Sequence, residues 1–86
     1  MTADAAIPEA ILALTTAAGP GKSICPTEVA RALEPEEAAW RPLMGRIRRA
    51  ALALQAEGRI DILRKGKPVA ADAVRGVIRL RRHQEA

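Results

Sequence analysis

Apolar residues recur every three to four positions in the first third of the chain, and this pattern predicts two helices. The first spans residues 5–18, with Asp4 as its expected N-cap, and a Gly-Pro-Gly sequence stops it. Its apolar stripe comprises Ile7, Ala10, Ile11, Leu14 and Ala18. A short extended segment at 23–25 then leads to Pro26, which suits the first position of the second helix. The stripe of that helix comprises Pro26, Val29, Ala30 and Leu33.

The longest apolar pattern predicts a third helix over residues 37–57, with Gly58 as its C-terminal stop. One face of this helix is expected to reach the core. It comprises Trp40, Leu43, Met44, Ile47, Ala50, Ala51 and Leu54. Pro42 interrupts the pattern, so we expect the regular helix to start near Trp40 and residues 36–39 to form a connecting turn. Trp40 is expected to anchor the core, because it shares the apolar face.

After the third helix the apolar period changes to two, which predicts strands. The first strand spans residues 59–64, a basic turn occupies 64–68, and the second strand spans residues 74–82. These strands are expected to pair, and the extended segment at 23–25 would add a third. The fold is therefore predicted to be mainly α with a small antiparallel sheet. Its element order is that of a winged helix-turn-helix domain, with three helices and a β-wing.

The chain has 86 residues, enough for one domain with a thin core. We expect a single domain over residues 1–86, with its core at about residues 5–82 and a frayed tail at 83–86. This length leaves no room for a cofactor-binding α/β fold, so no cofactor is expected. One cysteine, Cys25, and one histidine, His83, are too few for a zinc site, so no metal is expected either.

Charge is divided unevenly along the chain. Residues 1–40 carry two basic and six acidic side chains, whereas residues 41–86 carry twelve basic and four acidic ones. The first part therefore has a net charge of −4 and the second a net charge of +8. A strongly basic half is typical of a face that meets a polyanion. The single aromatic residue argues against RNA modules that stack bases on aromatic side chains.

Four stretches of the chain carry a family resemblance. They are the run Ser23-Ile24-Cys25-Pro26-Thr27-Glu28-Val29-Ala30-Arg31-Ala32-Leu33, the pattern from Trp40-Arg41 to Gly58, the Lys65-Gly66-Lys67 turn, and the pattern from Gly76 to Arg81. Together they resemble a small bacterial family of winged-helix domains of unknown function, over about residues 7–82. The resemblance implies the winged-helix fold and no particular activity. Pro42 is a local departure, within the stretch where a DNA-reading helix would begin.

The first functional hypothesis is DNA binding, as in a transcriptional regulator. In helix-turn-helix proteins the second helix of the pair lies in the major groove, where arginine reads guanine. The candidate contacts from the third helix and the basic wing are Arg41, Gly45, Arg46, Arg48, Arg49, Arg64, Lys65 and Lys67. The wing cations would contact phosphates. The same arginines also fit a solvated surface, and Glu34, Glu36 and Glu37 would repel phosphates.

The second hypothesis is a protein-interaction or homodimerisation module without nucleic-acid binding, because this fold does not determine a function. Leu52, Leu63 and Val77 are expected on outward surfaces, where they could form an apolar patch.

An enzyme is not expected. Gly21-Lys22-Ser23 echoes the end of a phosphate-binding loop, but position 16 holds threonine where that loop needs glycine.

The remaining expectations concern location and small ligands. No apolar run reaches the length of a membrane span, and acidic residues precede the first basic one, unlike a signal peptide. A cytoplasmic location without membrane contact is therefore expected, and no small-molecule substrate is predicted. The thiol of Cys25, at the start of the second helix, would be reactive if exposed, although burial is the commoner fate of a single cysteine.

Overall fold

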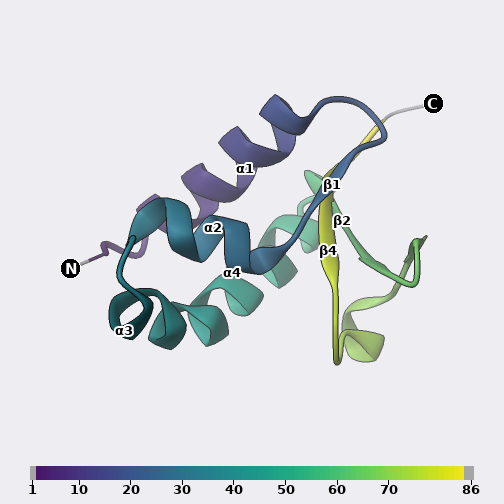
Figure 1. Cartoon of the computed structure of the whole chain (residues 1–86). Helices are drawn as coiled ribbons and strands as arrows, with labels where there is room; N and C mark the ends of the chain where they lie inside the picture. The colour runs from purple at the N-terminus through teal and green to yellow at the C-terminus, as the bar shows by residue number, and fades with distance from the viewer. Residues whose placement is uncertain (1, 85–86) are drawn as a thin grey trace.

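The computed structural model describes residues 2–84, in which three long helices pack against a small antiparallel sheet (Figure 1). The long helices are α1 (Ala6–Ala18), α2 (Pro26–Leu33) and α4 (Met44–Ala56). A single turn α3 (Glu37–Trp40) and a 3₁₀ turn η1 (Arg41–Leu43) connect α2 to α4. The strands are β1 (Ser23–Ile24), β2 (Ile60–Arg64), β3 (Lys67–Pro68) and β4 (Arg79–Arg82), and a second 3₁₀ turn η2 (Ala71–Ala73) precedes β4.

The strands form one sheet in the order β1-β4-β2-β3, with every neighbouring pair antiparallel. The predicted pairing between the two strands after α4 is confirmed, because Ile62 lies opposite Leu80. The predicted third strand is also confirmed, because Ile24 lies on the other side of Leu80. The fold class is therefore as predicted, a helix-plus-sheet arrangement of winged-helix-like order.

The core lies between the three long helices and the inner face of the sheet. Its buried members are Ile7, Ile11, Ile24, Val29, Ala30, Leu43, Ile47, Ala51, Leu54, Ile60, Ile62, Ile78 and Leu80. The predicted stripes of all three helices therefore point inward. Thr15, which the apolar pattern does not include, is also fully buried, and its Oγ1 donates a hydrogen bond to the Ile11 carbonyl 2.7 Å away.

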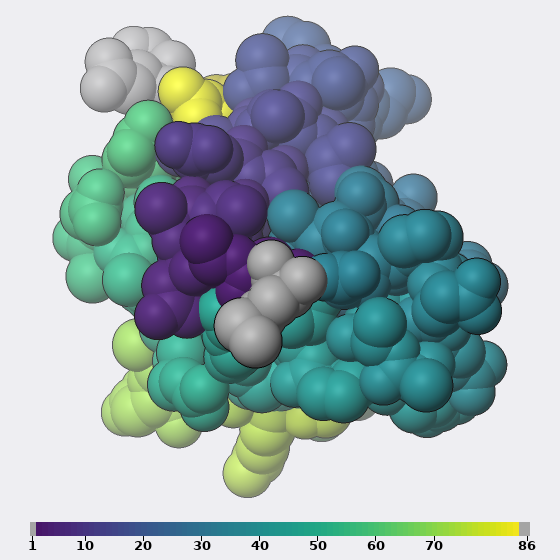
Figure 2. Space-filling model, turned by 90° about the vertical axis from the view of Figure 1, so that its left-hand side faces the viewer, coloured from purple at the N-terminus to yellow at the C-terminus, as the bar shows by residue number. Residues whose placement is uncertain are grey.

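The first helix starts without the predicted cap. Ala5 occupies the N-cap position and makes no side-chain cap hydrogen bond. Asp4 is instead 2.5 Å from Nη2 of Arg46 on α4, so the predicted capping role of Asp4 is wrong. The charged guanidinium offers this carboxylate a stronger hydrogen bond than a neutral main-chain amide does. Figure 2 shows the start of α1, in purple, against the teal segment of α3 and α4.

Pro42 divides the predicted third helix more deeply than expected. The prediction that residues 36–39 form a turn and that the helix starts near Trp40 is wrong, because α3 already begins at residue 37 and α4 begins only at Met44. Proline lacks the amide that a continuous helix needs and crowds the preceding turn, which explains the 3₁₀ geometry between them.

Trp40 consequently packs at the edge of the core rather than anchoring it. Its side chain is half-buried against the core cluster. The guanidinium carbons of Arg31 and Arg41 lie 5.7 and 5.4 Å from the centre of its ring, within the range of cation–π attraction. The tryptophan therefore joins α2 to the start of α4 through both apolar and charged contacts.

The segment between β2 and β4 forms a more elaborate wing than predicted. A fourth strand, β3, pairs with β2 and closes a hairpin whose two turn residues, Lys65 and Gly66, have φ of 54° and 80°. Two positive values in succession are typical of the type I′ turn. The predicted strand over 74–82 is wrong in its first half, because Gly76 has a φ of 66° and β4 begins only at Arg79.

The end of the described chain is tied to the sheet. The main-chain amide of His83 donates to the carbonyl of Arg59 at 3.1 Å, and its Nδ1 lies 2.8 Å from Oδ1 of Asp61. His83 therefore contacts the sheet, whereas the predicted fraying of residues 83–86 stays a prediction and residues 85–86 lie outside the described residues. Between residues 2 and 84, none of the helices has the length and apolar character needed to cross a bilayer.

Candidate nucleic-acid interface

The buried side of α4 determines where its arginines point. Ile47, Ala51 and Leu54 hold one side of the helix against the core, so the opposite side faces solvent. Gly45 and Arg49 lie on that solvent side and are exposed. A β-carbon added at Gly45 would meet only the Arg49 guanidinium, 3.7 Å away. At Gly45 the helix backbone is therefore accessible, because no other side chain covers it.

Two of the eight candidate residues are engaged in ion pairs. Nη2 of Arg46 contacts the Asp4 carboxylate at 2.5 Å and the Thr2 carbonyl at 2.9 Å. Nε of Arg41 donates to the Glu37 carboxylate at 3.0 Å, one turn earlier in the chain. These contacts partly neutralise both arginines. Arg46 thereby binds the N-terminal segment, and Arg41 binds α3.

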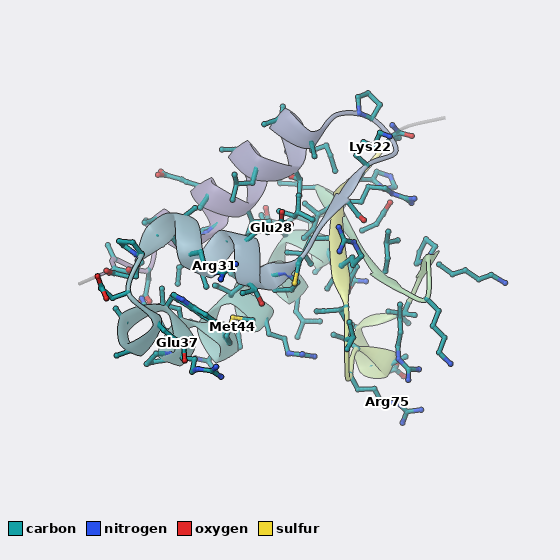
Figure 3. The ribbon with its side chains drawn as sticks, in the orientation of Figure 1. Lys22, Glu28, Arg31, Glu37, Met44 and Arg75 are labelled. Atoms are coloured by element: carbon teal, nitrogen blue, oxygen red, sulfur yellow. The ribbon has the colours of Figure 1, made fainter. Side chains whose placement is uncertain are left out.

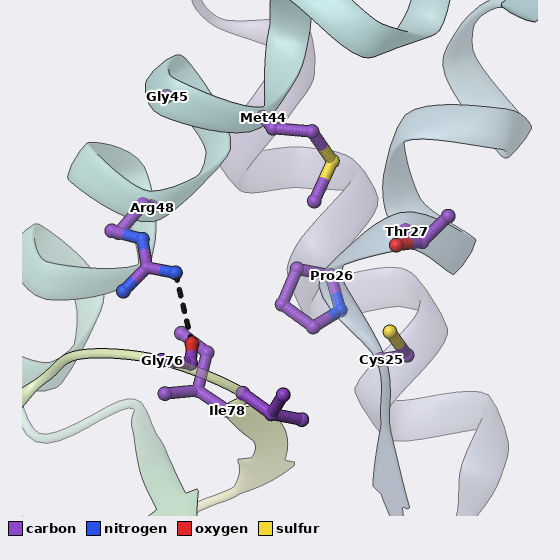
Figure 4. Close-up of a pocket in the computed structure, with 9 residues that line it drawn as sticks. Cys25, Pro26, Thr27, Met44, Gly45, Arg48, Gly76 and Ile78 are labelled. Atoms are coloured by element: carbon purple, nitrogen blue, oxygen red, sulfur yellow. Dashed lines mark hydrogen bonds between the residues drawn. The ribbon is translucent and has the colours of Figure 1, made fainter.

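Arg48 links α4 to the wing. Its Nη2 donates to the carbonyl oxygen of Gly76 at 3.2 Å, across a hollow of about 280 Å³ (Figure 4). Met44 on α4 and Pro26 at the start of α2 face this hollow, as does Ile78 just before β4. This hydrogen bond is one of the side-chain contacts that link the predicted DNA-reading helix to the wing.

The hairpin places further cations at the edge of the molecule. Lys65 and Lys67 are exposed, and Arg64 is half-buried with its Nε about 4.0 Å from where a β-carbon on Gly76 would lie. Arg64 and Lys67 are paired across the two hairpin strands, so the type I′ turn between them holds Lys65 at the tip. The sheet register therefore gathers the three predicted wing cations in one place.

The remaining candidates carry uncompensated charge. Within residues 2–84, no ion pair is formed by Arg48, Arg49, Arg64, Lys65 or Lys67. The acidic residues expected to repel phosphates are partly engaged elsewhere, since Glu37 binds Arg41 and Glu34 accepts a hydrogen bond from Thr2 Oγ1 at 2.7 Å. Positive charge on α4 and the wing is therefore available to an external anion.

Sequence reasoning missed two further cations of this region. Arg75 is exposed at the end of the wing segment, where Figure 3 labels it, and Arg79 is exposed at the start of β4. The predicted strand over residues 74–82 contains both arginines, so it does not place them beside the hairpin. Gly76 was the available signal, because a glycine inside a strand pattern often marks a break.

The predicted apolar patch does not form. Leu63 is buried, because it lies between Arg79 on β4 and Pro68 on β3 in the sheet register. Leu52 is half-buried, which leaves Val77, at 85 % exposure, as the only exposed large hydrophobic residue between residues 2 and 84. In the same part of the chain, histidine, cysteine and carboxylate side chains form no group of three that could hold a metal ion.

Comparison with known families places the chain in a family whose description names no function. The family described as protein of unknown function (DUF3253) matches residues 4–83. The chain belongs to this family. The DUF3253 match extends from Asp4, which binds Arg46, to His83, which contacts Asp61, so it covers every element of the fold. It confirms the expectation of a small domain of unknown function. Among curated proteins, none matches the chain.

Proposed function

We propose that this domain is a non-enzymatic module that binds double-stranded DNA through α4 and the wing hairpin. The observation that carries the proposal is the group of cations on these two elements that form no ion pair within residues 2–84. The hydrogen bond from Arg48 to Gly76 also links α4 to the segment before β4. Unpaired arginines and lysines on adjacent elements are what a phosphate backbone attracts, through release of its counterions.

The shape of α4 supports the same proposal. The helix has 13 residues, so it is about 20 Å long, and a helix of this kind fits the major groove of B-DNA. Its solvent side offers Arg49 above the accessible backbone at Gly45, which allows close approach to base edges. Arg48 stands beside them, toward the wing.

The contacts of the candidate residues support different roles for them. In this proposal, Arg48 and Arg49 reach base edges or the phosphates beside them. Arg64, Lys65 and Lys67 contact phosphates, where a positive charge is sufficient. The paired Arg41 and Arg46 contribute less, because an existing carboxylate partner must be exchanged for the phosphate.

Fluorescence anisotropy with a labelled mixed-sequence duplex, measured at several salt concentrations, tests the proposal. Binding should weaken steeply with salt, and the slope of log affinity against log salt should be about −0.9 for each phosphate contact. With three to five such contacts, the slope would be about −2.7 to −4.5. Absence of binding by folded protein at low salt would remove the proposal and favour the protein-interaction hypothesis.

A further inference from the structure

We propose that the outer face of the sheet carries a binding site for a phosphate group, organised by Arg79. A hollow of about 480 Å³ lies between Ser23, on the edge strand β1, and the wing hairpin. Its walls include Ser23 on β1, Arg64 and Lys65 on the hairpin, and Val77 and Arg79 beside β4. Neither Ser23 nor Arg79 belongs to the DNA interface proposed above.

Ser23 holds the guanidinium of Arg79 in a fixed orientation. Nε of Arg79 donates to Ser23 Oγ at 2.7 Å, and Nη2 donates to the Ser23 carbonyl at 2.9 Å. These two bonds occupy one edge of the planar group, and Nη1 has no hydrogen-bond partner between residues 2 and 84. A guanidinium that is already oriented loses little conformational freedom when it binds an anion.

The charge around the hollow is of one sign. Arg64, Lys65 and Arg79 all line it, no acidic side chain does, and within the described chain none of the three forms an ion pair. Neighbouring like charges repel, so an anion between them is favoured. A phosphate fits better than a chloride ion, because its several oxygens can accept hydrogen bonds from more than one of these donors.

The conformation of Lys65 supports the same site. Its φ of 54° lies in the left-handed region, where asparagine or glycine would suit the type I′ turn better than lysine. The turn geometry therefore does not account for lysine at this position, whereas a charge requirement does. Val77, next to the three cations and 85 % exposed, offers an apolar surface to the organic part of a phosphate ester.

Titration of the isotopically labelled protein with inorganic phosphate, followed by amide NMR at constant ionic strength, tests the site without any DNA. Saturable shifts are expected at residues 23, 64–66 and 77–79, and sodium chloride should not reproduce them. Arg79→Gln should weaken the phosphate Kd about tenfold, because it removes a charged hydrogen bond. Shifts that grow without saturation, or that chloride reproduces, would overturn the proposal.

Two further variants separate orientation from charge. Ser23→Ala keeps all three cations and the carbonyl bond from Nη2 but removes the hydroxyl bond from Nε, so Arg79 is oriented less tightly and the Kd should weaken about threefold. Lys22→Gln removes a charge from an exposed neighbour outside the hollow, and it should leave the Kd within about twofold. An effect of Lys22→Gln as large as that of Arg79→Gln would overturn the site, and an unchanged Kd for Ser23→Ala would overturn the orienting role of the Ser23 hydroxyl.

The phosphate can belong to a DNA backbone or to a small phosphate ester, and the first of these sources rests on the proposed function. Duplex binding by Arg79→Gln distinguishes them. If the site holds a backbone phosphate, the salt slope should become shallower by about 0.9. If it holds a small ester, the slope should not change, and glycerol phosphate should bind more tightly than inorganic phosphate. Failure of the wild type to bind DNA would remove the proposed function alone, because the phosphate titration decides this site independently.

Discussion

Arg48 and Gly76 are joined across the gap between α4 and the wing, by a hydrogen bond of 3.2 Å from Nη2 to the main-chain carbonyl (Figure 4). Gly76 has a φ of 66°, so the chain bends there and presents its carbonyl beside the helix. The helix is held by the core, whereas the segment before β4 has mostly exposed residues. The bond therefore links this exposed segment to a helix that packs in the core.

Replacing Arg48 by lysine should release the wing while keeping the charge. Lysine lacks the planar fork of guanidinium donors that reaches Gly76. The amides of residues 74–78 should then show lower NMR order parameters, with a stability loss of about 0.5–1 kcal/mol. Arg49→Lys is the matched control, because Arg49 makes no hydrogen bond to the wing. Equal order parameters in both variants would show that the bond does not restrain the segment.

Arg46 and Arg49, three residues apart on α4, should differ in what they contribute. Arg46→Gln removes contacts with Asp4 and the Thr2 carbonyl and should lower the free energy of unfolding by about 1 kcal/mol. Its effect on the salt slope of DNA binding should be small. Arg49→Gln should leave stability within about 0.5 kcal/mol and make the slope shallower by about 0.9. Urea unfolding and duplex anisotropy measure the two effects, and the reverse assignment would refute the division of roles.

The sequence predicts those elements of the fold that have a periodic apolar pattern, and it predicts less well the elements that depend on a single residue. The apolar stripes of α1, α2 and α4 and the apolar alternation of β2 and β4 are periodic signals, and they were predicted because burial selects residue type directly. The helix start at Met44 and the break at Gly76 were not, because a single proline or glycine has several possible local outcomes.

The candidate site was predicted in composition but not in pairing. All eight residues lie on α4, the turn before it, or the wing hairpin, as expected. Which of them carry free charge depends on contacts between residues more than 40 positions apart, such as Arg46 with Asp4. No local pattern encodes such a contact. The role of Arg79 was hidden for the same reason, since its partner Ser23 is 56 residues away.

Lys65→Asn should separate stability from binding. Asparagine adopts the left-handed conformation of the hairpin tip more readily than lysine, so the variant should be equally stable or more stable by about 0.5 kcal/mol. The lost charge should weaken both phosphate and duplex binding. Lys67→Asn is the control, because residue 67 is in a strand and gains nothing from this preference. A thermal melt that shows clear destabilisation by Lys65→Asn would contradict the turn assignment.

Asp61 should make stability depend on pH in the acid range. Partial burial by itself raises the pKa of this carboxyl, but hydrogen bonds from Arg81 and His83 outweigh it, so the pKa is lowered in the folded protein. A lowered folded-state pKa contributes stability at neutral pH that is lost as pH falls below about 4. The wild type should lose its advantage over Asp61→Asn across that range in urea unfolding. A constant difference between the two from pH 7 to pH 3 would refute this linkage.

The most direct test of the account compares two triple variants of equal charge. One carries Arg49→Gln, Lys65→Gln and Lys67→Gln in the proposed interface. The other carries Lys22→Gln, Arg31→Gln and Arg59→Gln, which replace exposed cations elsewhere (Figure 3 labels Lys22 and Arg31). Each removes three of the fourteen basic residues, so the net charge falls from +4 to +1 in both.

Circular dichroism should first show that both triple variants are folded, and duplex anisotropy then measures their binding across a range of salt concentrations. We predict that the interface triple makes the salt slope shallower by about 2.7 and lowers affinity at low salt by about 100-fold or more. The control triple should stay close to the wild type, because its charges lie away from α4 and the wing. Equal losses in the two variants would show that net charge alone attracts DNA, and would contradict a defined interface on α4 and the wing.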